Sequence, residues 1–104
     1  MFIVQTAKVW GGDSLEPEAS VFTTYAKAKM SYDMRRRKII NDFRSLFGDN
    51  CVCRFDYNDK RTAGVDAPVT FQEREDKFEI WYRDEMMYHF VMTIIEQIPD
   101  TIYV

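Results

Sequence analysis

The sequence predicts an α+β domain, in which an antiparallel sheet of four to five strands carries one long amphipathic helix on one face, in the approximate order β-β-α-β-β-β. Residues 23–48 have helical apolar periodicity and a helix signal at each end. The flanking segments are rich in the aromatic and β-branched residues that strands favour. Apolar residues make up 46% of the chain and aromatic residues 15%, so the 104 residues are expected to form a single domain, 1–104.

The first two strands are predicted before the helix. Residues 2–10 are dense in β-formers and apolar at both odd and even positions, which indicates a central strand. Gly11–Ser14 contains turn-forming residues. Residues 19–22 are long enough for a short strand that pairs back on the first.

The helix is expected to begin after Thr23 or Thr24 as N-cap and to end at Gly48. Arg36 falls inside its apolar stripe, so its stem is expected to snorkel to the helix edge or its guanidinium to pair with a sheet carboxylate. The predicted core face consists of Tyr25, Ala28, Tyr32, Ile39, Ile40, Phe43, Leu46 and Phe47.

The opposite helix face places two methionines among cations. Unbranched thioethers suit an adaptable surface, so this face is predicted to bind a protein partner or a second copy in a homodimer. The alternative is that a loop or strand of the same chain covers the methionines. The candidate partner-binding residues are Lys27, Met30, Met34, Arg37, Lys38, Asn41 and Arg44.

After the helix, residues 51–57 indicate a half-buried strand and residues 58–68 a mobile loop. Strands are then expected over 69–74 and 77–83, either separate or as one strand broken at Glu75-Asp76. Residues 86–98 fit both a helix that stops at Pro99 and a strand; their β-branched and aromatic content favours the strand.

The pattern of a strand, then a VFTTYAKAK helix start, then KFEIWYRDEMMYHFVMTIIEQI resembles small uncharacterised proteins of gut bacteria and their phages or mobile elements. In this chain Arg83-Asp84-Glu85-Met86 stands where those proteins often carry Asp-Gly. The resemblance implies no activity; an origin on a mobile element would suit a modulator or inhibitor of a host protein. The matching residues are Val21, Phe22, Thr23, Ala28, Phe78, Glu79, Ile80, Tyr82, His89, Ile94, Ile95 and Glu96.

No catalytic residue, metal site or cofactor is predicted. Cys51, Cys53 and the single His89 make an incomplete zinc set, and their spacing does not indicate a nucleophile and base. The acidic residues of 73–79 are expected on a solvated strand face, with Glu73, Glu75 and Glu79 on the same side. The sequence lacks GxGxxG, P-loop, GxSxG and HExxH motifs.

Charge is segregated along the chain. Residues 23–47 contain seven Lys or Arg and two Asp or Glu, whereas residues 69–104 contain three and eight, so helix and sheet are expected to attract each other. The run Arg35–Lys38 points around the helix, so no more than two of its cations share the outward face. With a net charge of −3, nucleic acid is a disfavoured partner.

The sequence therefore predicts a non-enzymatic protein-interaction module. The first alternative is a nucleic-acid-associated regulator that uses the basic helix face. The second is a small-ligand binder with a pocket lined by Trp10, Trp81 and Tyr82. No signal peptide and no apolar run of membrane-spanning length is found, so a cytoplasmic location without a membrane partner is expected.

Overall fold

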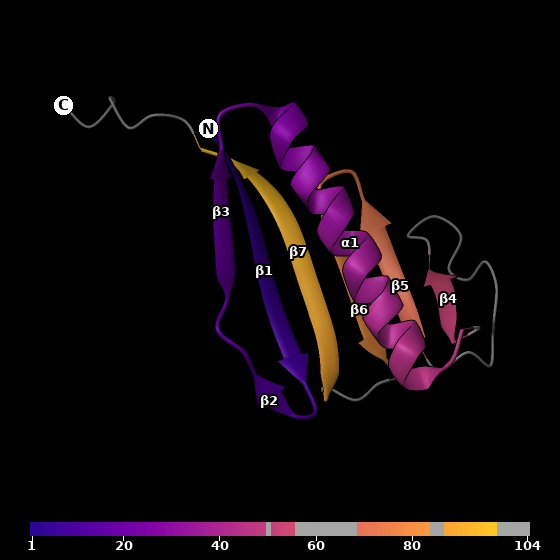
Figure 1. Ribbon diagram of the computed structural model, residues 1–104. Helices are drawn as coiled ribbons and strands as arrows, with labels where there is room; N and C mark the ends of the chain where they lie inside the picture. The colour runs from indigo at the N-terminus through magenta and orange to yellow at the C-terminus, as the bar shows by residue number, and fades with distance from the viewer. Residues whose placement is uncertain (50, 56–68, 84–86, 98–104) are drawn as a thin grey trace.

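A computed structural model of the chain describes residues 1–49, 51–55, 69–83 and 87–97. One helix lies across one face of a single sheet (Figure 1). The strands follow the order β2-β1-β7-β6-β5-β4, and β3 pairs with β1 on the side of β2. The elements are β1 (Phe2–Trp10), β2 (Asp13–Ser14), β3 (Glu18–Phe22), α1 (Tyr25–Phe47), β4 (Val52–Phe55), β5 (Val69–Arg74), β6 (Lys77–Tyr82) and β7 (Tyr88–Glu96).

The predicted fold class is confirmed, because one long helix packs on one face of a largely antiparallel sheet. The sheet has seven strands instead of four or five, since Asp13–Ser14 forms a short strand and β5 and β6 are separate strands of a hairpin. One pair differs from the prediction: β4 and β5 run parallel.

The ambiguous segment near the end of the chain is a strand, as favoured from its composition. β7 pairs with β1 over nine residues, from Phe2 opposite Glu96 to Trp10 opposite Tyr88, and its other edge pairs with β6. Both edges of β7 are therefore hydrogen-bonded inside the sheet, an environment that favours β-branched and aromatic side chains.

Even-numbered positions of β1, β6 and β7 face α1 and build the core. Odd-numbered positions face the other side of the sheet, which no described element covers, and there Val21 of β3 is 57% and Ile95 of β7 43% exposed. The core is thus a single layer between helix and sheet. Its fully buried strand residues include Val4, Val69, Phe78, Ile80 and Met92.

The helix ends were identified correctly. The Thr24 hydroxyl accepts a hydrogen bond from the Lys27 backbone N–H at 3.2 Å, and Gly48, at φ 105°, donates its N–H to the Arg44 carbonyl at 2.8 Å. Five of the eight predicted core residues are buried. Phe47 is half-buried, whereas Tyr25 and Leu46 are exposed because they lie in the first and last turns, near the rim of the sheet.

Three polar contacts join α1 to the β5–β6 hairpin, and one of them pairs a helix cation with a sheet carboxylate. The Tyr25 hydroxyl donates to Asp76 Oδ1 at 2.6 Å, and Lys29 Nζ donates to the Glu75 carbonyl at 3.1 Å. Arg36 pairs with the Glu73 carboxylate, one of the two outcomes expected for a cation in the apolar stripe. Helix cations and sheet carboxylates therefore attract each other within one chain.

The loop predicted over 58–68, the end of the strand predicted over 51–57 and the turn Asp84–Met86 lie outside the described residues. Within the described ranges, no helix is both long and apolar enough to cross a membrane.

Candidate functional site

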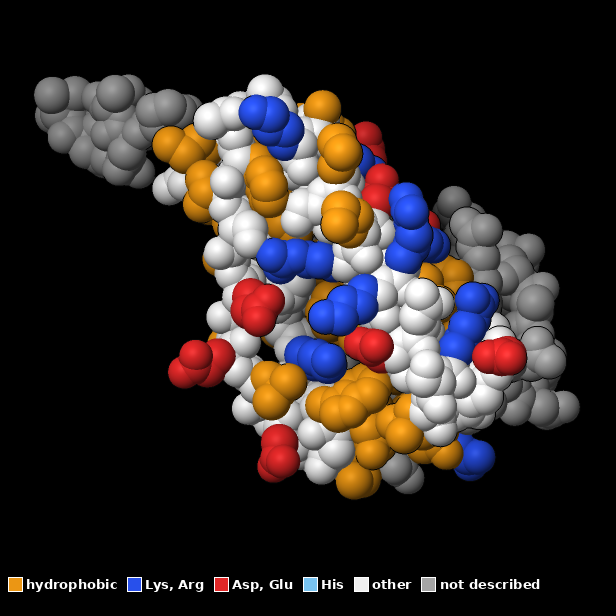
Figure 2. Space-filling view, in the orientation of Figure 1, with side chains coloured by type: hydrophobic (Ala, Val, Ile, Leu, Met, Phe, Trp, Pro, Cys, Tyr) orange, Lys and Arg blue, Asp and Glu red, His pale blue; other side chains and the backbone are white. Residues whose placement is uncertain are grey.

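The predicted partner-binding residues form one continuous surface, here called the outer stripe: Lys27, Met30, Met34, Arg37, Lys38, Asn41 and Arg44. All seven are exposed on α1. At about 100° and 1.5 Å per residue, they span about 120° of the helix circumference and about 26 Å of its length. Figure 2 shows cationic and apolar side chains interspersed along this face.

The methionines of the outer stripe are its most distinctive members. Met30 is 67% and Met34 66% exposed, the highest values among the exposed large apolar residues described. The alternative that another part of the chain covers them does not hold for any described segment. Their role in binding a partner stays a prediction.

The outer stripe carries four cations and no carboxylate. Within the run of four cations, only Arg37 and Lys38 belong to it. Arg36 turns to Glu73 and lies over the rings of Phe71 and Phe78, with its Cζ 5.8 and 5.3 Å from their centroids. The positive charge of the outer stripe is thus smaller than the sequence run suggests, and Asp33 and Asp42 lie beside the stripe on α1.

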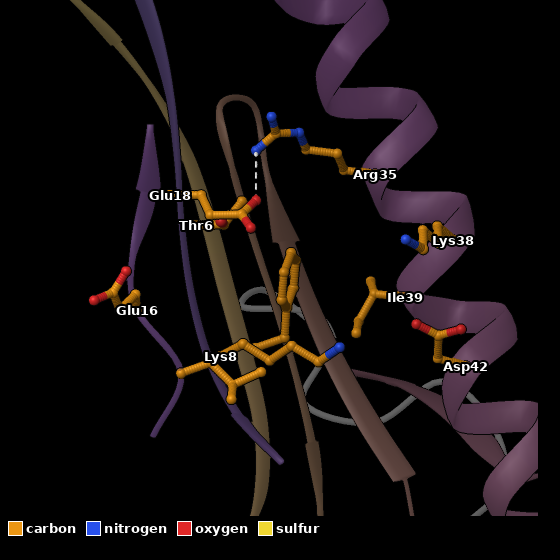
Figure 3. Close-up of a pocket in the computed structure, with 10 residues that line it drawn as sticks. Thr6, Lys8, Glu16, Glu18, Arg35, Lys38, Ile39 and Asp42 are labelled. Carbon is orange, nitrogen blue, oxygen red and sulfur yellow. Dashed lines mark ion pairs between the residues drawn. The ribbon is translucent and has the colours of Figure 1, made fainter. Parts of the chain in front are cut away.

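Beside the outer stripe, a pocket of about 280 Å³ lies between β1 and α1 (Figure 3). It lies where the chain connecting β2 to β3 diverges from the middle of β1. Buried Ile39 and Phe90 contribute apolar lining. Lys8 and Lys38 direct their amines towards the same space, with the Asp42 carboxylate nearby.

Arg35 borders this pocket with an incompletely satisfied guanidinium. Its Nη2 donates to the Ser20 hydroxyl at 2.7 Å. Its Nη1 is buried and has no hydrogen-bond acceptor among the described residues, since the Glu18 carboxylate is 3.9 Å away, an ion pair beyond hydrogen-bond length. A buried N–H group without an acceptor costs about 1–3 kcal/mol, so this donor favours an additional acceptor.

The pocket proposed for the small-ligand alternative does not form as expected. Trp10 and Tyr82 lie on the helix side, in an aromatic cluster with Phe43, Phe47 and Tyr88 at the C-terminal end of α1. Trp81 faces the opposite side of the sheet, because strand neighbours alternate and Ile80 and Tyr82 face α1. The three aromatics therefore cannot line one cavity.

The cysteines and the histidine are far apart. Cys53 pairs with Thr70, Thr70 with Trp81, and Trp81 with His89, so three strand spacings, about 14 Å, separate Cys53 from His89. The Cys51 thiol is buried, with Sγ 3.6 Å from the Phe43 carbonyl, and its burial raises its pKa. Among the described residues, no group of three His, Cys, Asp or Glu could hold a metal ion.

The expectation that Glu73 and Glu79 share one face is wrong. Arg74 pairs with Lys77 across the turn, so Glu73 lies opposite Phe78 on the helix side, while Glu79 lies opposite Gln72 on the other side. There its Oε2 contacts His89 Nε2 at 2.7 Å. His89 is thus a diagonal cross-strand partner of Glu79.

No family model, curated protein or solved structure matches the chain.

Sequence reasoning missed the pocket and its charged border. In the sequence, Arg35 is notable only as one of four consecutive cations, and no local pattern marks Lys8 or Glu18 as site residues. These side chains meet only through the pairing of β1 with β3 and the position of α1 above them. Lys38 is the one predicted site residue that also lines the pocket.

Proposed function

We propose that this protein is a cytoplasmic, non-enzymatic interaction module that binds an acidic protein surface through the outer stripe of α1. The observation that carries the proposal is the pair of two-thirds exposed methionines inside an acid-free row of cations. Methionine adapts its shape to an apolar partner surface, and the cations steer a partner of opposite charge.

The size of the outer stripe sets the strength of this interaction. A strip about 26 Å long and about 10 Å wide covers about 260 Å², whereas a stable complex buries about 800 Å² on each partner. The outer stripe alone supports a weak, rapidly exchanging complex. A tighter complex requires contacts on neighbouring surface, such as exposed Leu46 near the helix end.

The test is a pull-down from the native host with the wild-type protein and a Met30→Asp, Met34→Asp variant. Both side chains are exposed, so each substitution should change the free energy of unfolding by no more than about 0.5 kcal/mol, while partner capture is lost. A Met87→Asp variant is the matched control, because Met87 is 46% exposed but lies outside α1. Wild-type-like capture by the double variant would contradict the proposal.

The partner's identity is a separate question. The resemblance to mobile-element proteins leads us to propose a host protein whose activity is modulated or inhibited. Self-association through the same stripe is the other form of the proposal. Sedimentation velocity distinguishes them, because a homodimer dissociates in the Met30→Asp, Met34→Asp variant without any added partner.

A nucleic-acid-associated regulator is the second candidate. It is supported by the four cations of the outer stripe, which contains no carboxylate. The net charge of −3 opposes it. It predicts binding of a labelled oligonucleotide that weakens steeply with salt and is lost in an Arg37→Glu, Lys38→Glu variant but retained in Lys77→Glu. Lack of binding at low salt would exclude this candidate.

A further inference from the structure

The pocket between β1 and α1 has a chemistry of its own, apart from the outer stripe. Ile39, which is 3% exposed, and Phe90, which is 6% exposed, form an apolar part. Arg35, Lys8 and Lys38 form a cationic border. Pockets that bind small molecules combine a mostly apolar lining with a few polar groups that fix the ligand's orientation.

The positive charges of this border are only partly neutralised by carboxylates of the protein itself. Within the described residues, neither Lys8 nor Lys38 forms an ion pair; Arg35 is anchored by the Ser20 hydroxyl, and its one ion pair is the long contact to Glu18. The Glu18 side chain is 75% exposed, so water competes strongly for its carboxylate. Arg35 is therefore an anchored donor with a weak and replaceable partner.

Not all of the carboxylates that line the pocket point into it. Glu16 borders the pocket, but Figure 3 shows its carboxylate directed away from it. Asp42 points into the pocket from α1, and Glu18 contacts Arg35. Three cations against two nearby carboxylates leave an excess of positive charge inside the pocket.

We propose that this pocket binds a small organic anion, whose carboxylate or phosphate group replaces Glu18 as the partner of Arg35 Nη1 and whose apolar body packs on Ile39 and Phe90. The anion supplies the acceptor that the buried N–H group lacks. Lys8 and Lys38 add long-range attraction. The volume of about 280 Å³ is at the lower limit for small-molecule pockets, which limits the apolar body to about one aromatic ring.

The test is a titration followed by ¹H–¹⁵N NMR with phenylacetate, phenyl phosphate and neutral phenylacetamide. Because charge-assisted hydrogen bonds to Arg35 require an anion, both acids should bind at least about tenfold more tightly than the amide. Shifts are expected at the amides of Thr6, Ile39 and Phe90. Tighter binding of one acid identifies the preferred anionic group. Equal binding of acids and amide, or no shifts at these positions, would refute the proposal.

Variants of Glu18 and Lys38, which are exposed, and of Asp42, which is half-buried, test the assignment without altering the apolar core. Glu18→Gln removes the competing carboxylate and should tighten phenylacetate binding about fivefold, as expected for one unit charge at about 4 Å in water. Asp42→Asn should act in the same direction, and Lys38→Gln in the opposite one. Weaker binding in Glu18→Gln would overturn the assignment of Arg35 as the anion's partner.

The site is separable from the outer stripe. Met30→Ser, Met34→Ser removes both thioethers without adding charge beside Arg35 and Lys38 and leaves the pocket lining unchanged, so this variant should bind phenylacetate with wild-type affinity. Loss of phenylacetate binding in that variant would show that the probe binds the outer stripe, which contradicts the pocket site. Failure to find a protein partner does not affect the titration.

Discussion

At the residue scale, two neighbouring arginines have opposite environments. Arg36 pairs with Glu73 across the interface between helix and sheet, whereas Arg37 is exposed. Arg36→Ala should lower the free energy of unfolding by about 1–2 kcal/mol, because it leaves a half-buried carboxylate without its partner and removes the guanidinium from two rings.

Urea unfolding of Arg36→Ala and Arg37→Ala measures this difference. Arg37→Ala is the matched control and should stay within about 0.5 kcal/mol of wild type. Equal losses in both variants would mean that the pair with Glu73 contributes nothing to stability.

Tyr25 provides a test based on pH. Its hydrogen bond to Asp76, together with desolvation and the nearby carboxylates, raises its pKa to about 12. Since the folded pKa lies above that of an unfolded tyrosine, about 10, the associated stability is full below about pH 10 and is lost as pH rises through about 12.

Asp76→Asn keeps an acceptor for Tyr25 but removes the negative charge, so the pKa should fall towards about 10. A ¹³C NMR titration of labelled tyrosine, assigned with Tyr25→Phe, measures it. Glu75→Gln is the control with a smaller shift, because Glu75 acts on Tyr25 only through its charge. An unchanged pKa in Asp76→Asn would contradict the assigned cause.

At this scale, the sequence correctly predicted the side-chain directions that helical geometry determines. The phase of α1 placed Met30 and Met34 outside and Arg36 inside, because a helix fixes the direction of every side chain. It failed for Glu73 and Glu79, which were treated as positions on one strand. The two-residue turn between β5 and β6 exchanges odd and even positions, and only the turn's length determines this.

At the element scale, α1 begins at a hydroxyl cap that can be tested against its neighbour. Thr24→Ala removes the acceptor for the Lys27 N–H and should cost about 1 kcal/mol of stability. Thr23→Ala changes an exposed residue one position earlier and should be nearly neutral. Thermal unfolding monitored by circular dichroism compares them, and a larger loss in Thr23→Ala would place the cap one residue earlier.

The strands were predictable in position but not in pairing. Composition identified the last strand, although its periodicity also fitted a helix; pairing with β1 along its whole length accounts for the strand. The parallel arrangement of β4 and β5 carried no local signal, because strand direction depends on the path of the chain between the strands.

At the scale of the whole molecule, stability should decline from the middle of the sheet to its margin. β1 is hydrogen-bonded to β7 on one side and to β2 and β3 on the other, whereas β4 pairs with β5 over four residues. Native-state hydrogen exchange should therefore be slowest in β1 and β7 and fastest, among these strands, in β4. Slower exchange in β4 than in β1 would contradict this order.

The charge segregation was visible in the sequence, and its internal explanation is confirmed in part by the contacts of Tyr25, Lys29 and Arg36 with the β5–β6 hairpin. The pocket was not predictable, because Lys8, Glu18 and Arg35 come from three elements. Their proximity depends on long-range register, which a single sequence does not encode locally.

Because the core lies on one face of the sheet, folding depends on which side chains of each strand point to that face. Deleting one residue in the middle of β1 would shift one part of the strand by one position against β7, and every side chain in that part would move to the opposite face of the sheet. A substitution such as Val4→Ala leaves every other side chain on its own face. A change of length in the middle of β1 is therefore more damaging to the core than the loss of any one side chain there.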